Sequence, residues 1–206
     1  MKLFDFAFSP NCRKVRAVAY ELGIALEHER VDLLRGAQRG PAFLARNPNG
    51  RVPVLEDGDL VLWESTAIIR YLAAGSPLVP TARRTAAEVD RWVSWQVAHL
   101  GPAMSKVSFE RIVKPFTGGG APDPARIAEG TAEFDGLTAI LDHALADRDH
   151  VAGPLTIADF ALAAHYSLAA AAGLELARHP RVESWLARIC ARDSMKRALS
   201  DAQAAL

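Results

Sequence analysis

Residues 52–75 read VPVLEDGDLVLWESTAIIRYLAAG, and this stretch decides the fold of the first part of the chain. Two apolar runs flank the pair Asp57 and Gly58, which is favoured in two-residue hairpin turns because both central positions need a positive φ. After the second run the apolar residues recur at helical spacing, with Ser65 as a candidate N-cap and Gly75 at the end. The sequence therefore predicts a β-hairpin that leads directly into a helix.

A strand, a helix and another strand are predicted upstream of this hairpin. The run KLFDFAF at residues 2–8 is predicted to be a half- or fully buried strand. Ser9 is a candidate N-cap, Pro10 suits the first helical position, where its missing N–H costs nothing, and Gly23 closes the helix. The run LEHERVDL at residues 26–33 is predicted to be the second strand. Because a helix joins the two strands, we expect them to be parallel.

The remaining sequence divides into an irregular connection, a linker and a helical region. The connection before the hairpin contains at most a short helix around PAFLAR. The segment SPLVPTARR is proline-rich and aperiodic, as linkers are. From about residue 85 the alanine-rich sequence has helical spacing and no convincing strand. We therefore predict an α/β plus all-α protein, with an α/β domain at 1–75, a linker at 76–84 and an all-helical domain at 85–206.

Composition and charge are those of an ordinary globular protein. The 206 residues include 24 Lys and Arg and 24 Asp and Glu, so the net charge of zero does not favour binding to nucleic acid or to a membrane. Asp5 interrupts the apolar start of the chain, so a signal peptide is not expected. The six histidines show no paired ligand spacing, and no metal site is expected. The two cysteines form no disulfide framework, which favours the reducing cytoplasm.

Several motifs resemble the cytosolic glutathione transferase family, and they follow one another over about 180 residues. SPNCRKVR is similar to the catalytic turn of that family, and ARNPNGRVPVLEDGDLVLWESTAIIRYL to its glutathione-binding run. LTIADFAL and HPRVESWLARI are similar to its helical domain. The resemblance is to serine-type members of the bacterial theta, phi and nu kind. It implies a thioredoxin-like domain (βαβ-ββα) before the helical domain, glutathione as co-substrate, a cytoplasmic homodimer and a role in detoxification.

The resemblance implies that Ser9 holds the sulfur of glutathione. A free thiol has a pKa of about 8.5, so only a small fraction is thiolate at neutral pH. A hydroxyl at this position donates a hydrogen bond to the thiolate in serine-type members, and Asn11 matches a position where some members place a second, amide donor. The bare sequence leaves open that Ser9 only caps a helix. Cys12 is the rival nucleophile, or else a thiol packed inside the helix.

The glutathione-binding run supplies the next set of implied contacts. Family members have a cis-proline at the position of Pro53, which lets the main chain of Val52 pair with the cysteinyl part of glutathione. Glu64 would pair the γ-glutamyl ammonium, and Ser65 with the open N–H groups of its helix would bind the carboxylate, because a helix N-terminus is an anion site. The alternative for Pro53 is an ordinary proline in an edge strand, and the alternative for Ser65 is a simple helix cap.

Two further regions are implied only by their places in the family pattern. Candidates for binding the glycyl carboxylate are Gln38, Arg39 and Arg51. Loop arginines are most often simply solvated. Candidates for the electrophile pocket are Phe8, Leu100, Met104, Val107 and Arg111. A stripe of Met and Leu on a helix is more often core than pocket, so core packing is the alternative.

The predicted function is a glutathione transferase that adds the glutathione thiolate to an electrophilic small molecule. A glutathione-dependent peroxidase or disulfide-bond reductase using the same site is the alternative in chemistry. A non-catalytic scaffold with the same fold is the alternative in class. A pure scaffold need not retain Ser9, Pro53, Glu64 and Ser65 together, which argues against that alternative.

Overall fold

The computed structural model describes residues 1–203, which form two compact units. The first unit is Met1–Val79 with the segment that begins at Ala191, and the second is Pro80–Cys190. The elements of the first unit are β1 (Lys2–Asp5), α1 (Pro10–Glu21), β2 (Glu27–Arg30), η1 (Ala37–Arg39), α2 (Pro41–Leu44), β3 (Val54–Asp57), β4 (Leu60–Trp63), α3 (Ser65–Leu72) and α10 (Asp193–Gln203).

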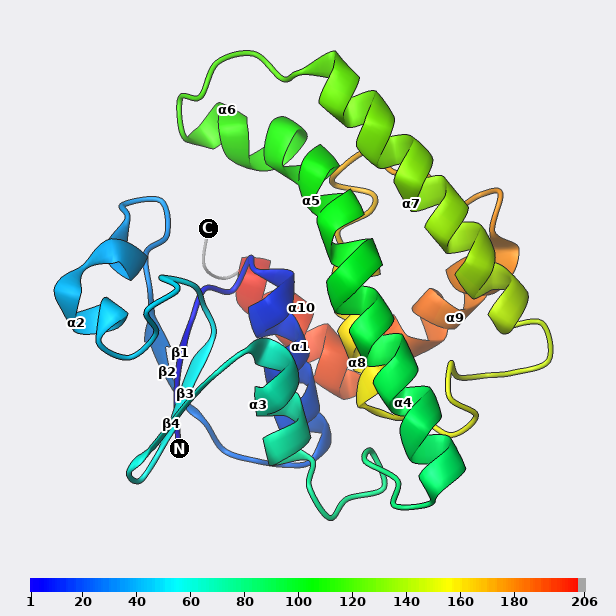
Figure 1. The fold of residues 1–206 in the computed structure, drawn as a ribbon, viewed down its shortest axis with the longest axis horizontal. Coiled ribbons are helices and arrows are strands. Elements are labelled where there is room, and N and C mark those ends of the chain that lie inside the picture. Colours follow the sequence, from blue (N-terminus) through cyan, green and yellow to red (C-terminus); the bar gives the residue numbers. More distant parts are fainter. Residues whose placement is uncertain (204–206) are drawn as a thin grey trace. The chain divides into compact units, whose positions relative to one another are not determined.

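The first unit is built on a mixed sheet with the strand order β2-β1-β3-β4. β1 and β2 are parallel, as the connecting helix predicted, whereas β3 is antiparallel to both β1 and β4. Figure 1 shows α1 and α3 on one face of this sheet and α2 on the other. Alternate residues of a strand point to opposite faces. Phe4 and Val54 accordingly join Val31 and Phe43 in a buried cluster on the α2 side.

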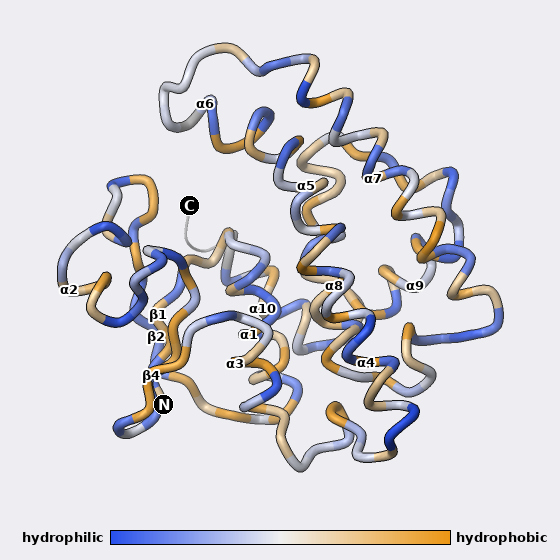
Figure 2. Tube along the Cα trace, in the orientation of Figure 1, coloured by the Kyte–Doolittle hydropathy of each residue, from blue (hydrophilic) through white to orange (hydrophobic). Residues whose placement is uncertain are grey.

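The predicted hairpin is present, but its turn lies one residue later than expected. Asp57 pairs with Leu60, so the two turn residues are Gly58 and Asp59. Gly58 has φ 60°, and within residues 1–203 the one non-glycine residue with a positive φ is Glu64. Only the first turn position therefore needs a left-handed backbone, and glycine supplies it. In Figure 2 the hairpin is hydrophobic along its strands and hydrophilic at its tip.

The C-terminal helix α10 packs on α1 in the first unit (Figure 1), whereas the predicted limits place it in the helical domain. Buried charges join the two helices. Arg16 pairs with the buried Asp5 at 2.5 Å and with Asp201 of α10 at 2.8 Å. The hydroxyl of Tyr20 also donates to Asp201, at 2.7 Å. Asp201 is more than 180 residues from Arg16 and from Tyr20, so no local pattern could reveal these two contacts.

The second unit is helical throughout, as predicted from residue 85 onward. Its elements are α4 (Arg83–Trp95), α5 (Gly101–Ser108), α6 (Lys114–Phe116), α7 (Pro124–Ala144), α8 (Ile157–Tyr166) and α9 (Pro180–Cys190), with the π-helical turns η2 (Gln96–Leu100) and η3 (Phe109–Val113) before and after α5. All ten residues of α8 are buried, so α8 is the central helix of this unit. Within residues 1–203, no helix is long and apolar enough to cross a membrane.

A capping box begins α8, as the motif LTIADF predicts. The side chain of Thr156 accepts from the main chain at Asp159, and Asp159 accepts from the N–H of Thr156 at 2.9 Å. The Asp159 carboxylate also accepts from the N–H of Val151 at 3.1 Å and from the indole of Trp185 at 3.0 Å. One buried carboxylate therefore joins the start of α8 to a preceding loop and to α9.

Candidate functional site

The strand register brings three predicted site segments to one end of the sheet. Val54, the first residue of β3, pairs with β1 on one side and with Trp63 of β4 on the other. Both pairings are antiparallel, so the residues after β1, before β3 and after β4 lie at the same end. These three segments contain Ser9, Pro53 and Glu64 respectively. The sheet therefore positions residues that are far apart in the sequence.

Ser9 is the N-cap residue of α1, as predicted, but its side chain makes no capping hydrogen bond. Its backbone is extended (φ −71°, ψ 125°), and Pro10 follows at the first helical position. The side chain is half-buried. Because the start of a helix carries partial positive charge, an anion at this turn is stabilised. The hydroxyl of Ser9 is thus not used as the cap of α1.

Cys12 is fully buried within the first turn of α1. The main-chain N–H of Phe6 donates to its Sγ at 3.4 Å. Burial raises the pKa of the Cys12 thiol to about 12, although the hydrogen bonds from Phe6 and from the side chain of Ser9 lower it. At neutral pH this thiol is protonated, and a thiol reacts as a nucleophile only as its thiolate. The packed thiol is therefore the interpretation that the surroundings of Cys12 favour.

The first turn of α3 differs from the prediction in its N-cap. Glu64, not Ser65, is the N-cap residue, with φ 70° and ψ 105°. This left-handed backbone at Glu64 starts the helix, and Ser65 becomes its first helical residue. The hydroxyl of Ser65 donates to Oδ1 of Asn11 at 3.2 Å. The structure therefore brings Asn11 and Ser65, two predicted site residues from different helices, into direct contact.

Lys14 and Thr66 are site neighbours that the sequence reasoning missed. Lys14 is fully buried in α1, and its Nζ donates to Oγ1 of Thr66 in α3 at 3.4 Å. Burial lowers the pKa of Lys14 to about 7, and the charge of Glu64 opposes this shift. Lys14 is four residues before Val18 and so lies on the predicted apolar face of its helix. A charged residue on that face was the signal that could have identified it.

The peptide bond between Val52 and Pro53 is cis, as the resemblance implied. The side chain of Val52 packs against the cluster of Phe4, Val31, Phe43 and Val54. Val52 precedes β3 and is outside the registered strand pairs. Its side chain is therefore anchored in the core, while its main chain lies next to the sheet end where the three segments meet.

The candidates for the glycyl carboxylate lie in the connection before the hairpin. A Cβ at Gly50 would be 3.2 Å from the carbonyl oxygen of Gln38, so the turn before Arg51 runs close to η1. Gln38 is half-buried, and its Oε1 is buried without a hydrogen-bond partner among the described residues. Arg39 and Arg51 are exposed. The structure thus brings Gln38 next to the Gly50 turn and leaves both guanidinium groups in solvent.

The candidates for the electrophile pocket fall in both units. Phe8, in the first unit, is half-buried and its ring centroid is 5.4 Å from that of Phe6. Leu100, Met104 and Val107 are all buried in the second unit. Val107 faces α7 so closely that a Cβ at Gly130 would lie 2.8 Å from it. Val107 therefore packs between α5 and α7, in agreement with the core alternative.

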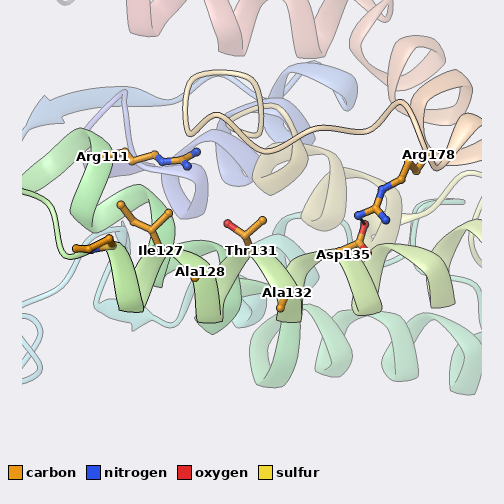
Figure 3. Close-up of a pocket in the computed structure, with 8 residues that line it drawn as sticks. Arg111, Ile127, Ala128, Thr131, Ala132, Asp135 and Arg178 are labelled. Atoms are coloured by element: carbon orange, nitrogen blue, oxygen red, sulfur yellow. Dashed lines mark ion pairs between the residues drawn. The ribbon is translucent and has the colours of Figure 1, made fainter.

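Arg111 fixes a loop of the second unit. Its Nη1 donates to the carbonyl oxygens of Ala172 and Gly173 at 2.6 and 2.9 Å. Arg111 also lines a cavity of about 620 Å³ along one face of α7 (Figure 3), where Asp135 forms an ion pair with Arg178. The cavity is lined by Arg111, Pro124, Ile127, Ala128, Thr131, Ala132, Asp135 and Arg178. All of these residues belong to the helical unit.

Comparison with known proteins shows the family of this chain. The sequence model of the glutathione S-transferase N-terminal domain matches residues 3–80. Glutathione S-transferase 3 of Zea mays is 34% identical over 212 residues, which cover 97% of this chain and 93% of that protein. The chain belongs to the glutathione S-transferase family.

Solved glutathione S-transferases share the fold of this family member. The theta class enzyme of Xanthomonas axonopodis pv. citri, solved with glutathione bound, is 32% identical with a TM-score of 0.89 over 96% of each chain. Glutathione S-transferase I from maize, in complex with an atrazine glutathione conjugate, is 25% identical with a TM-score of 0.90, covering 100% of this chain and 99% of that one. The predicted fold, a thioredoxin-like domain followed by a helical domain, is confirmed.

Proposed function

We propose that this glutathione transferase binds glutathione at the sheet end where Ser9, Val52 and Glu64 meet, and adds its thiolate to an electrophilic small molecule. The family membership supports the reaction class. The two solved relatives with glutathione or a glutathione conjugate bound support glutathione as the co-substrate. The antiparallel register, which gathers the three segments, supports the location.

The observation that carries the proposal for Ser9 is that its hydroxyl does not cap α1. The Ser9 side chain also hydrogen-bonds Cys12, but that thiol is protonated and can itself donate, which leaves the Ser9 O–H to donate to the sulfur of glutathione. A hydrogen bond to a charged partner contributes about 1.5–3 kcal/mol, which lowers a thiol pKa by roughly 1–2 units if it favours only the thiolate. The start of α1 acts in the same direction. The amide oxygen of Asn11 accepts from the Ser65 hydroxyl, which leaves the amide nitrogen of Asn11 to donate a second hydrogen bond to the sulfur.

The γ-glutamyl end of glutathione is proposed to bind at the first turn of α3. Glu64 is exposed and pairs the ammonium. Because the hydroxyl of Ser65 donates to Asn11, the carboxylate binds mainly to the open main-chain N–H groups of Ser65 and Thr66. Ser65 then contributes by fixing this turn to α1.

The rest of glutathione is proposed to extend past Val52. The main chain of Val52 pairs with the cysteinyl residue in the manner of a strand, which its position outside the registered pairs supports. The glycyl carboxylate reaches Gln38, whose amide presents a donor or an acceptor depending on which way it is turned. Arg39 and Arg51 add positive charge at the exposed rim.

The electrophile is proposed to bind near Phe8 in the first unit. Within the helical unit, the packing of Val107 and the loop contacts of Arg111 favour structural roles for these two residues over direct contacts with the electrophile. A panel of halides, peroxides and disulfides separates conjugation from the alternative peroxidase or disulfide-bond reductase reaction. Turnover of none of the three, with glutathione still bound, would favour the scaffold.

A homodimer is also part of the proposal. The outer strand β4 exposes Leu60, Val61 and Trp63, and Tyr71 of α3 is exposed as well. Large exposed hydrophobic residues on an edge strand favour association with another chain. Light scattering should therefore give twice the mass of the chain, and Trp63→Glu should reduce it toward the monomer mass. Both cysteines are free thiols, which supports a cytoplasmic location, and family membership supports a role in detoxification.

The test of the catalytic site compares Ser9→Ala with Cys12→Ala. Ser9→Ala should raise the pKa of bound glutathione and lower kcat near neutral pH about 10- to 100-fold, with a modest change in affinity. Cys12→Ala should leave the pH profile nearly unchanged, because the reacting thiol belongs to glutathione. An inactive Cys12→Ala, an active Ser9→Ala and a glutathione mixed disulfide on Cys12 by intact mass would overturn the assignment. If only Asn11→Ala lost activity, the amide would be the main thiolate donor.

A further inference from the structure

Two polar bridges join α1 to the first turn of α3. In one, the hydroxyl of Ser65 donates to Asn11, and in the other the ammonium of Lys14 donates to the hydroxyl of Thr66. Asn11 and Lys14 are three residues apart and so lie on the same side of α1. The second bridge brings the Lys14 ammonium within hydrogen-bonding distance of the Thr66 side chain, and the N–H of Thr66 belongs to the helix turn that is proposed to hold the γ-glutamyl carboxylate.

Lys14 is an unusual residue for this position because its side chain is fully buried. Burying an ammonium is costly unless other groups compensate the charge. The Thr66 hydroxyl accepts one hydrogen bond, and the nearby carboxylate of Glu64 favours the charged form. Burial nevertheless lowers the pKa of Lys14 to about 7, so its charged and neutral forms are both populated near neutral pH.

The other charged and titratable groups around α1 include residues of β1, α3, α10 and α1 itself. Asp5 of β1 and Asp201 of α10 both pair with Arg16. Arg70 is the second charged residue at α3, one turn beyond Thr66. Cys12, two residues before Lys14 on α1, is protonated because burial raises its pKa to about 12. Glu64 is therefore the acidic group that acts most directly on Lys14.

We propose that Lys14 is a charged positioning residue of the glutathione site, which attracts the γ-glutamyl carboxylate through the first turn of α3 and takes up a proton when glutathione binds. The proposal rests on the glutathione site proposed above. Lys14 donates to the side chain of Thr66, and the main-chain N–H of that same residue is one of the proposed carboxylate donors. A bound anion at this turn favours the protonated lysine, and the protonated lysine favours the anion.

The sign of the pH dependence follows from this coupling. A bound carboxylate raises the pKa of Lys14 above its value of about 7 in the free protein. The contribution of protonated Lys14 to the glutathione affinity is complete below the pKa that Lys14 has in the free protein. It is lost as the pH rises through the pKa that Lys14 has in the complex. If the pKa of Lys14 differs by about one unit between the free protein and the complex, the glutathione affinity falls about tenfold as the pH rises past both pKa values.

The experiment measures the Kd of S-methylglutathione between pH 6 and pH 9, because this probe has no ionisable thiol. From pH 6 to pH 9 the affinity of wild-type protein for this probe should fall about tenfold more than the affinity of Lys14→Met, since methionine has no charge to lose. Lys14→Arg should retain the affinity at low pH and lose the decrease above pH 7, because arginine stays charged. Lys2→Met, a lysine in β1 paired with Glu27 and Glu29, should behave as wild type.

The outcomes separate this proposal from the proposed site itself. If wild-type protein does not bind S-methylglutathione, the glutathione site is wrong and the proposal falls with it. If wild type binds and Lys14→Met has the same Kd and pH dependence, the site stands and the role of Lys14 is wrong. A merely structural role would shift the Kd of Lys14→Met equally at every pH, which also overturns the proposal.

A second measurement applies if Lys14→Met does not fold. The probe is the S-methyl analogue in which glutaryl replaces γ-glutamyl, so that it keeps the carboxylate and lacks the ammonium. Calorimetry with wild-type protein at pH 7.5, in two buffers of different ionisation enthalpy, should show proton uptake on binding, because the bound carboxylate raises the pKa of Lys14 above its value in the free protein. Binding without proton uptake would overturn the role of Lys14.

Discussion

Replacing Asp159 by alanine should remove a large share of the stability of the protein. The carboxylate is fully buried and accepts from three N–H groups, those of Val151, Thr156 and the Trp185 indole, at 2.9 to 3.1 Å, and from the hydroxyl of Thr156 at 3.3 Å. The three N–H donors belong to fully buried residues, so solvent cannot reach them without a rearrangement. Asp159→Ala leaves each of them without this acceptor.

The magnitude follows from the number of donors. A buried donor that loses its partner costs about 1–3 kcal/mol. For three donors we expect about 3–6 kcal/mol, since a water molecule entering the vacated space would restore part of the loss. This is a large share of the roughly 5–15 kcal/mol that stabilises a typical protein. Asp159→Asn keeps the shape and one acceptor oxygen, so it should cost less than Asp159→Ala.

The assay is urea denaturation followed by far-UV circular dichroism, with Asp123→Ala as the matched control. Asp123 is the N-cap of α7 and accepts from the N–H groups of Ala125 and Arg126. Asp123 is partly exposed, so water can replace it, and the loss of an N-cap costs about 1 kcal/mol. If Asp159→Ala cost no more than Asp123→Ala, the reasoning from buried donors would be refuted.

Two further predictions concern packing and pH. In urea denaturation, Gly130→Ala should destabilise the protein by about 1–3 kcal/mol, because the new Cβ would lie 2.8 Å from a side-chain carbon of α5. Gly136→Ala should instead stabilise α7 by up to about 1 kcal/mol, because no atom lies within 4 Å of the new Cβ. Equal effects of the two substitutions would contradict this prediction. Burial raises the pKa of Asp5, but hydrogen bonds from His28 and Arg16 hold it below its ordinary value. The stability that Asp5 contributes is therefore complete above about pH 4 and is lost as the pH falls through its folded pKa, so the deficit of Asp5→Asn should shrink in acid denaturation curves.

Local signals in the sequence were enough for most secondary structure. The apolar runs around Gly58, the helix signals around Ser9 and the capping box at Thr156 each act within a few residues, and each element is present in the structure. The displaced turn and the N-cap at Glu64 were missed because neighbouring residues share the same preferences. A choice between adjacent positions depends on strand register and backbone conformation, which no single residue determines.

The sequence by itself determined the order of the elements and, through the family resemblance, the names of the residues now gathered at one end of the sheet. Only the tertiary structure decided their environment. It buried Cys12 and Lys14, which raises the pKa of the thiol and lowers that of the lysine, and it paired Arg16 with Asp201 across more than 180 residues. A side chain's charge state depends on desolvation and on nearby charges in space, and most of those neighbours are distant in the chain.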